Sequence, residues 1–271
     1  MSIELPGALV SPEWLAEHLD DVTVLDASDA MAEPTEATIK GGPRFDIDGP
    51  FSDHDSDLPH TMIGVDDFRR EARKLGINDD SVVVVYDTRG IYSSPRAWWM
   101  LRAMGLDTVA VLDGGLRGWL AAGYPTVPRA ELPAEPGNFE PRPRDGAFVD
   151  ADTVLQQLED PTIAVADARS RGRFAGSDPE PRPGLRGGHM PGAVNIPFTE
   201  LLDGGAFLTP GELRTHFEEA AGDRTRFTMT CGSGLTACIL ALGATLAGHE
   251  DISIYDGSWS EWGRPGPLPV L

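Results

Sequence analysis

The fold of this chain is decided by the stretch Thr230-Cys231-Gly232-Ser233-Gly234-Leu235-Thr236-Ala237-Cys238. It follows a short run over 226–230 that is typical of a buried strand, and it precedes a small-residue apolar helix expected over 239–248. Cys231 therefore lies at a strand-to-helix turn, where the glycines on both sides of Ser233 let the backbone curl around the sulfur.

This turn is suited to holding a reactive thiolate. The backbone N–H groups of residues 232–237 can point inward and, with the positive end of the following helix, form a cradle for an anion. Such an environment favours the thiolate, which is the nucleophilic form of cysteine. The alternative is a buried structural cysteine, the commonest fate of a free Cys. A packing cysteine does not need glycines on both sides of a serine, so the pattern favours a catalytic loop.

The composition excludes several classes of partner. At 271 residues the chain has room for one large domain or two ordinary ones. Its net charge of −21 argues against nucleic acid and anionic membranes, which require a basic face. No apolar run approaches the ~20 residues of a membrane span, and residues 1–6 lack the features of a signal peptide, so we expect the cytoplasm. An anionic substrate must therefore be bound by cations gathered locally.

The two cysteines do not form a disulfide framework. Cys231 and Cys238 are seven positions apart on a mostly helical path, roughly 10 Å, which is too far for a disulfide. Cys238 is expected to pack within the helix. A disulfide-exchange protein needs a Cys-x-x-Cys motif, which the chain lacks.

The chain contains one unit twice. Residues 24–27 (Val-Leu-Asp-Ala) match residues 165–168 (Val-Ala-Asp-Ala) at a shift of 141, and Trp119 matches Trp262 at a shift of 143. The predicted elements also repeat in order. We expect helices over 12–19, 65–75 and 95–104 with strands over 22–27, 81–86 and 108–112, and then helices over 151–158, 210–221 and 239–248 with strands over 163–167, 226–230 and 251–255.

Each copy is predicted to be an α/β domain. Alternating strands and helices indicate a parallel sheet flanked by helices on both faces. We expect a first domain over 1–124, a proline-rich linker over 125–146 and a second domain over 147–271. In open α/β sheets, sites form at the carboxyl ends of the strands, where the Cys231 loop falls. In the first copy the corresponding position is Asp87, which cannot act as a thiolate.

The chain resembles the two-domain sulfurtransferases of the rhodanese superfamily over nearly its whole length. The residues that carry this resemblance are Asp167-Ala168-Arg169, Gly188-His189-Met190-Pro191-Gly192-Ala193-Val194-Asn195-Ile196-Pro197, the Cys231 loop, and the Asp-Gly and Trp endings of both halves. The resemblance implies two tandem rhodanese-like domains, of which the first is catalytically silent and the second carries the sulfur. Asp87 opposite Cys231 agrees with this.

The loop sequence resembles the branch of the family that uses 3-mercaptopyruvate. Residues 232–237 include no basic residue, whereas thiosulfate, a compact dianion, needs charge beside the sulfur. The carboxylate of mercaptopyruvate lies farther from the reacting sulfur, so its cations can sit on another loop. A thiosulfate sulfurtransferase is the alternative. The expected substrate-binding residues of the loop are Gly232, Gly234, Leu235 and Thr236.

Five arginines between positions 169 and 186 form a local basic cluster in this acidic chain. Guanidinium groups pair bidentately with carboxylates. By resemblance, Arg173 and Arg182 match the positions that hold the carboxylate and carbonyl of the substrate. We expect Arg169 to make an internal structural pair, and Arg171 and Arg186 to make ordinary salt bridges on a solvated surface loop.

The resemblance also implies a proton relay. Asp48 and His60 match an N-terminal segment in which an Asp and a His act with the loop serine, here Ser233. The alternative is an acidic surface loop. His189 matches a structural turn. Residues 53–64 do not form a calcium loop, because Leu58 replaces the glycine that such a loop needs.

The expected reaction is a two-step sulfur transfer. Cys231 takes the sulfur of the donor as a persulfide, and an acceptor (cyanide, a small thiol or a thioredoxin-like protein) then removes it. The resemblance implies no metal and no organic cofactor. A cysteine phosphatase needs an arginine six residues after the cysteine, where this chain has Ala237. A non-catalytic binding module fits the first copy, but Cys231 argues against it for the second.

Overall fold

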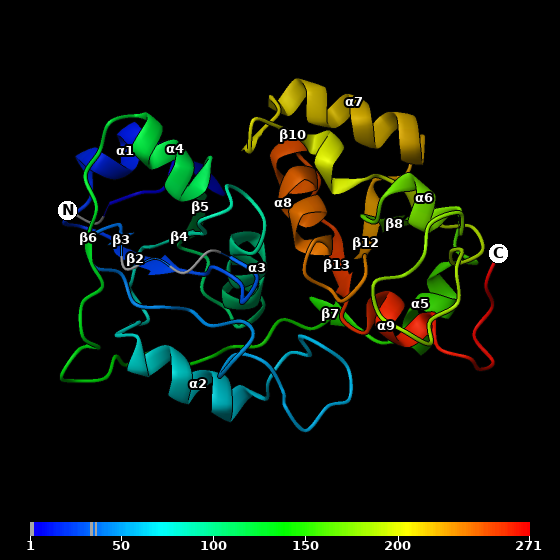
Figure 1. Ribbon diagram of the computed structural model, residues 1–271, viewed down its shortest axis with the longest axis horizontal. Helices are drawn as coiled ribbons and strands as arrows, with labels where there is room; N and C mark the ends of the chain where they lie inside the picture. Colours follow the sequence, from blue (N-terminus) through cyan, green and yellow to red (C-terminus); the bar gives the residue numbers. More distant parts are fainter. Residues whose placement is uncertain (1–2, 33–34, 36) are drawn as a thin grey trace. The chain divides into compact units, whose positions relative to one another are not determined.

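The computed structural model of the protein describes residues 3–32, 35 and 37–271. The chain divides into two compact units, which Figure 1 labels by their helices and strands. Unit 1 contains residues 1–53, 62–144 and 204–207, and unit 2 contains residues 54–61, 145–203 and 208–271. The short segment 54–61 therefore comes from the first half of the sequence but belongs to unit 2.

Unit 1 is built on a four-stranded parallel sheet. Its central strands are buried at every position, because helices cover both faces. Helices α1 (Pro12–Glu17) and α4 (Gly115–Ala121) contribute Leu15 and Trp119 to one hydrophobic core. The other helices are α2 (Val65–Lys74) and α3 (Ser94–Ala103). In spatial order the strands are β1 (Leu9–Val10), β5 (Val109–Leu112), β4 (Val83–Tyr86) and β2 (Thr23–Asp26).

Unit 2 repeats this arrangement. Its sheet has the same spatial order of corresponding strands, all parallel, with one short strand added at the edge. The predicted duplication is therefore confirmed at the level of topology. In spatial order the strands are β7 (Phe148–Val149), β13 (Ile252–Tyr255), β12 (Arg226–Thr230), β8 (Ile163–Asp167) and β9 (Val194–Asn195).

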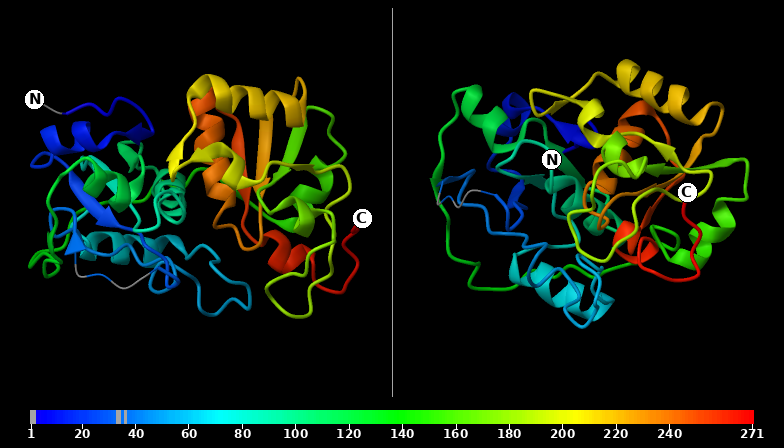
Figure 2. Two further views of the ribbon diagram at one scale, coloured as in Figure 1. Left: turned by 45° about the horizontal axis from the view of Figure 1, so that its top comes forward. Right: turned by 45° about the vertical axis from the view of Figure 1, so that its right-hand side comes forward.

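Helices cover both faces of the unit 2 sheet, as predicted. Figures 1 and 2 show α7 (Pro210–Ala221) and α8 (Ala237–Ala247) on one side, with α5 (Ala151–Gln157) and α9 (Ser258–Trp262) on the other. The second face is packed by a core that includes Val154, Trp259 and Trp262. Helix α7 begins with a capping box between Thr209 and Glu212, which fixes its first turn.

The short helices and strands were not predicted from the sequence. The remaining ones are β3 (Ala37–Thr38), β6 (Val127–Pro128), α6 (Arg171–Phe174), the 3₁₀ helix η1 (Phe198–Leu201), β10 (Leu202–Asp203) and β11 (Ala206–Phe207). Together with β1, β7, β9, α4 and α9, they are too short to show a hydrophobic period. Helix α8 begins at Ala237, two residues before the predicted start.

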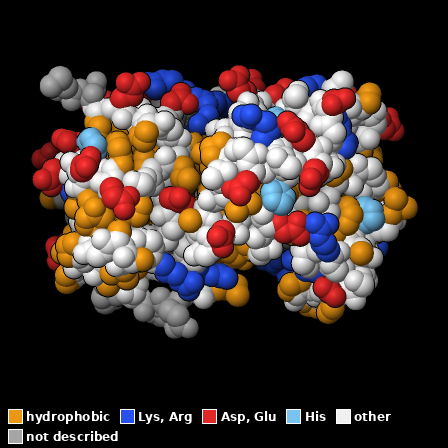
Figure 3. Space-filling view, turned by 90° about the horizontal axis from the view of Figure 1, so that it is seen from above, with side chains coloured by type: hydrophobic (Ala, Val, Ile, Leu, Met, Phe, Trp, Pro, Cys, Tyr) orange, Lys and Arg blue, Asp and Glu red, His pale blue; other side chains and the backbone are white. Residues whose placement is uncertain are grey.

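The surface carries charges of both signs. On the described face that Figure 3 shows, acidic side chains are spread among apolar ones and small groups of basic ones. In the ranges 3–32 and 37–271, no helix is long and apolar enough to cross a membrane.

Candidate active site

Cys231 lies in a buried loop with unused hydrogen-bond donors. The loop joins the end of β12 to the start of α8, and 2 % of the Cys231 surface is exposed. Within the described part of the chain, five backbone N–H groups of this loop have no acceptor: those of Gly232, Ser233, Leu235, Thr236 and Ala237. Buried N–H groups are nearly always paired, so this cluster is a cradle suited to an anion.

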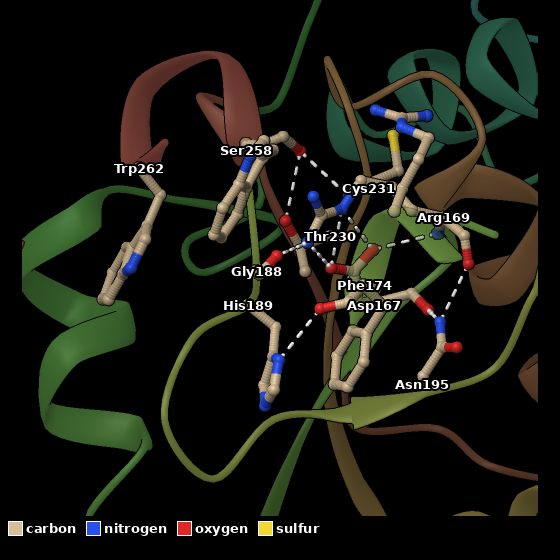
Figure 4. Close-up of polar contacts among 12 residues, drawn as sticks. Asp167, Arg169, Phe174, Gly188, His189, Asn195, Thr230, Cys231, Ser258 and Trp262 are labelled. Atoms are coloured by element: carbon tan, nitrogen blue, oxygen red, sulfur yellow. Dashed lines mark hydrogen bonds and ion pairs between the residues drawn. The ribbon is translucent and has the colours of Figure 1, made fainter. Parts of the chain in front are cut away.

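Residues of α9 make hydrogen bonds to the backbone of the Cys231 loop. Ser258 Oγ accepts a hydrogen bond from the N–H of Cys231 at 3.2 Å (Figure 4). The same oxygen donates to the carbonyl of Tyr255 at 2.8 Å. The N–H of Trp259 donates to the Cys231 carbonyl at 3.0 Å. Ser260 donates to the Gly232 carbonyl through both its N–H (2.9 Å) and its Oγ (2.6 Å). The carbonyls of Cys231 and Gly232 therefore point toward α9. In a trans peptide the next N–H points the opposite way, so the N–H groups of Gly232 and Ser233 point away from α9.

A buried charge cluster lies under the loop. The side chain of Arg169 is fully buried and forms ion pairs with Asp167 (2.7 Å) and Glu180 (2.7 Å). It also donates to the Gly188 carbonyl at 2.8 Å (Figure 4). Its guanidinium lies 3.9 Å from the ring centre of Trp259. The prediction of an internal pair for Arg169 is confirmed. The cluster joins β8 to α9 and so supports the loop from a rigid base.

Arg173 lies directly against the Cys231 loop. Its Nη2 atom is 3.1 Å from the position that a Cβ atom on Gly232 would occupy, so a side chain at position 232 would press on this guanidinium group. Nη2 also donates to Glu180 at 2.6 Å. Glu180 therefore binds two guanidinium groups, one buried on Arg169 and one partly exposed on Arg173. This shared carboxylate orients Arg173 while leaving its Nη1 group available to another anion.

The remaining arginines of the cluster differ in their partners, and Arg186 does not make the surface salt bridge expected of it. Arg182 is exposed and makes no hydrogen bond or ion pair with the part of the chain that the structure describes. Arg171 forms an exposed ion pair with Glu200 at 2.7 Å. Arg186 donates to the carbonyls of Trp262 (2.8 Å) and Leu268 (2.9 Å), so it holds the chain near α9. Arg182 is therefore a cation available for a ligand.

Two predicted relay residues lie together in unit 2. His60 Nδ1 is 3.0 Å from Ser233 Oγ, although the two residues are 173 positions apart. Asp48 belongs to unit 1, where its Oδ2 accepts a hydrogen bond from the N–H of Ala30 at 2.6 Å. The role of Asp48 in the relay stays a prediction.

His189 occupies a structural turn. Its Nδ1 donates to the Phe174 carbonyl at 2.9 Å, and its ring stacks on that of Phe174 at 4.0 Å (Figure 4). Its backbone also pairs with Leu271 through two hydrogen bonds. In residues 3–32, 35 and 37–271, no cluster of three or more His, Cys, Asp or Glu side chains is placed to hold a metal ion.

The corresponding loop of unit 1 holds a carboxylate. Asp87 is fully buried, and it accepts hydrogen bonds from the N–H groups of Arg89 (2.9 Å), Tyr92 (2.9 Å), Ser93 (3.0 Å) and Ser94 (3.0 Å) and from the Oγ of Ser94 (2.7 Å). Burial raises the pKa of the Asp87 carboxyl, and these hydrogen bonds oppose the rise. The cradle of the first copy is thus filled by its own side chain, which leaves no room for an anionic reaction centre.

Two functional features escaped the sequence analysis. The clamp by Ser258 and Ser260 was missed because both serines follow the cysteine by more than 25 positions. The only feature of the sequence that could have pointed to these serines is that they follow Asp256-Gly257, one of the paired endings of the two copies. The role of Glu180 was missed because nothing in the local pattern tells which carboxylate pairs with which arginine.

Comparison with known proteins gives consistent results. A model of the rhodanese-like domain matches residues 11–122 and 150–264. The chain is 42% identical to the 3-mercaptopyruvate sulfurtransferase of Homo sapiens, over 96% of this chain and 93% of that protein. It is 38% identical to the thiosulfate sulfurtransferase of Rattus norvegicus, over 96% and 93%. The crystal structure of SseA from Escherichia coli, a 3-mercaptopyruvate sulfotransferase, superposes with a TM-score of 0.82 at 36% identity, over 94% of this chain and 100% of that one.

Proposed function

The chain belongs to the rhodanese family of sulfurtransferases, and on that basis we propose that it transfers the sulfur of 3-mercaptopyruvate through a persulfide on Cys231. The observation that carries the choice of donor is the pair formed by Ser233 and His60, at 3.0 Å, in a cysteine loop without basic residues. When the carbon–sulfur bond of 3-mercaptopyruvate breaks, the carbon is left as an enolate that has to gain a proton. A serine and a histidine in contact can deliver that proton. Local positive charge, which a compact dianion such as thiosulfate needs, is absent from residues 232–237.

In the first step the Cys231 thiolate attacks the sulfur of the donor. A sulfur–sulfur bond forms and the carbon–sulfur bond breaks, and the electron pair of the broken bond stays on the carbon as the enolate of pyruvate. The N–H groups of the cradle stabilise the thiolate before the attack and the persulfide after it. Since these donors are held by the clamp from α9, they need little reorganisation during the reaction.

The enolate formed in this step needs a proton to become pyruvate. The thiol of the donor loses its proton when the persulfide becomes an anion, and the enolate carbon gains one to give pyruvate, so protons and charges balance. Ser233 Oγ would pass this proton, with His60 Nδ1, 3.0 Å away, as its partner. Asp48 would complete the relay by orienting His60.

Arg173 and Arg182 would bind the carboxylate and carbonyl of the donor. Arg173 lies against Gly232 with its orientation set by Glu180, and Arg182 is exposed without a partner among the described residues. Binding by guanidinium groups fixes the donor so that its sulfur faces Cys231. The cations supply locally the positive charge that the acidic chain lacks as a whole.

A thiophilic acceptor then removes the outer sulfur and regenerates the thiolate, which predicts ping-pong kinetics. Cyanide, a small thiol or a thioredoxin-like protein would serve. A reducing compartment such as the cytoplasm would suit this reaction, because it needs Cys231 as a thiol. Thiosulfate is the second candidate donor, favoured by the similarity to the thiosulfate sulfurtransferase of Rattus norvegicus.

Replacing Arg173 with glutamine tests how the donor is bound. We expect KM for 3-mercaptopyruvate to rise about tenfold or more, because a charge-assisted hydrogen bond to its carboxylate is lost. The fold should persist, since Glu180 keeps its ion pair with Arg169. The measurement is steady-state release of pyruvate with a thiol acceptor. Arg171→Gln is the matched control, because Arg171 pairs with Glu200 on the surface. Equal KM values for both variants would remove Arg173 from the binding site.

A further inference from the structure

The segment 54–61, which carries His60, is attached to α9 of unit 2 by an arginine. Arg264 Nη1 donates to Asp57 Oδ2 at 2.7 Å, and Nη2 donates to the backbone carbonyl of Asp57 at 3.0 Å. Its Nε donates to the Ser260 carbonyl at 3.0 Å. One guanidinium group therefore binds Asp57 of the segment through two hydrogen bonds and Ser260 of α9 through a third.

His60 needs such an attachment. Its φ angle is +60°, in the left-handed region, which costs a residue with a side chain about 1 kcal/mol or more. A strained conformation persists only where surrounding contacts hold it. Within the segment, Thr61 Oγ1 donates to Ser56 Oγ at 2.9 Å, which shapes the turn but does not attach it to unit 2. The bonds from Arg264 provide that attachment.

The same helix holds the nucleophile. Ser260, whose carbonyl accepts from Arg264, donates to the Gly232 carbonyl through its N–H and its Oγ. Helix α9 is therefore a common base for both partners of the relay: Ser233, through the Cys231 loop, and His60, through Asp57. The hydrogen bonds and charge of Arg264 hold the pKa of the Asp57 carboxyl below its usual range, so the pair is ionised at neutral pH.

We propose that the ion pair between Asp57 and Arg264 is a latch that positions His60 against Ser233 and thereby supports proton delivery to the leaving enolate. Asp57 and Arg264 are positioning residues, since neither touches the reacting atoms. This inference rests on the proposed function.

The two candidate donors separate a positioning role from a structural one. Transfer from 3-mercaptopyruvate requires a proton for the enolate carbon. In transfer from thiosulfate the electron pair of the broken sulfur–sulfur bond leaves with sulfite, and no proton is moved. Losing the latch should therefore slow loading of Cys231 by 3-mercaptopyruvate while leaving loading by thiosulfate nearly unchanged.

The experiment measures single-turnover loading of the full-length protein by each donor, read as one added sulfur by intact mass. Arg264→Gln and Asp57→Asn should each slow loading by 3-mercaptopyruvate about tenfold, and loading by thiosulfate less than about twofold. Arg226→Gln is the matched control, because Arg226 forms an ion pair of the same length, 2.7 Å, with Asp251 at a similarly exposed place.

Each other result contradicts a stated claim. If 3-mercaptopyruvate does not load the unmodified protein, the proposed function fails and the latch with it. If it does, but Arg264→Gln loads as fast as Arg226→Gln, the latch alone is refuted. An equal loss with both donors would show that the contact is structural and would also overturn the inference.

Discussion

Replacement of Cys231 by serine is expected to lower pyruvate release from 3-mercaptopyruvate by at least about a thousandfold. Serine fits the same space, but its hydroxyl is not ionised near neutral pH and does not form a persulfide. The cradle, the clamp from α9 and Arg173 all remain, so the fold and the binding of the donor should be retained. The loss should therefore appear in kcat, with KM little changed.

Cys238 provides the control for this variant. It is fully buried, and its Sγ donates to the Gly234 carbonyl at 3.3 Å, so Cys238→Ser keeps a donor at this point. We expect Cys238→Ser to retain most of the activity and to accept one sulfur, as the unmodified protein does. If Cys231→Ser also accepted a sulfur, or if only Cys238→Ser lost activity, the assignment of the nucleophile would be wrong.

Replacement of Arg169 by methionine is expected to lower the free energy of unfolding by about 3–5 kcal/mol. Methionine fills similar space but leaves two carboxylates without their buried cation. The side chains of Asp167 and Glu180 are 1 % and 3 % exposed, so neither gains much hydration when Arg169 is removed. The contact of the guanidinium with the ring of Trp259 is lost as well.

The measurement is urea unfolding followed by circular dichroism, and Arg171→Met is the matched control. The side chain of Arg171 is 70 % exposed in its pair with Glu200, so its loss should cost less than about 1 kcal/mol. Arg169→Met should also reduce sulfur loading, because Arg169 supports Trp259 and the carboxylate that orients Arg173. Equal stability of the two variants would contradict the account of the buried cluster.

The local parts of the site followed from the sequence. Strand β12 was predicted over its observed range, and the glycines around Ser233 predicted the turn that carries Cys231. These features depend on residues close together in the chain, where hydrophobic pattern and backbone freedom are informative. Comparing the two copies identified Asp87 as the counterpart of Cys231, and the structure adds that its carboxylate accepts bonds from the N–H groups of its own loop.

The supporting parts of the site did not follow from the sequence. Helix α9 has five residues and no side-chain cap, and its first residue, Ser258, adopts a φ of +48°. The local sequence therefore gives no pattern from which this helix could be predicted. The shared role of Glu180 depends on which charges the fold buries together. The attachment of segment 54–61 through Arg264 joins residues 207 positions apart. These contacts are products of tertiary packing, which single-sequence patterns do not encode.

The central claim is that Cys231 receives sulfur from 3-mercaptopyruvate. It is tested most directly by incubating the purified protein with 3-mercaptopyruvate or thiosulfate, without an acceptor, and measuring the rate at which its intact mass gains one sulfur. We expect both the rate and the final extent to be higher with 3-mercaptopyruvate. Faster loading by thiosulfate would contradict the choice of donor, and no added sulfur from either compound would contradict sulfur transfer through Cys231.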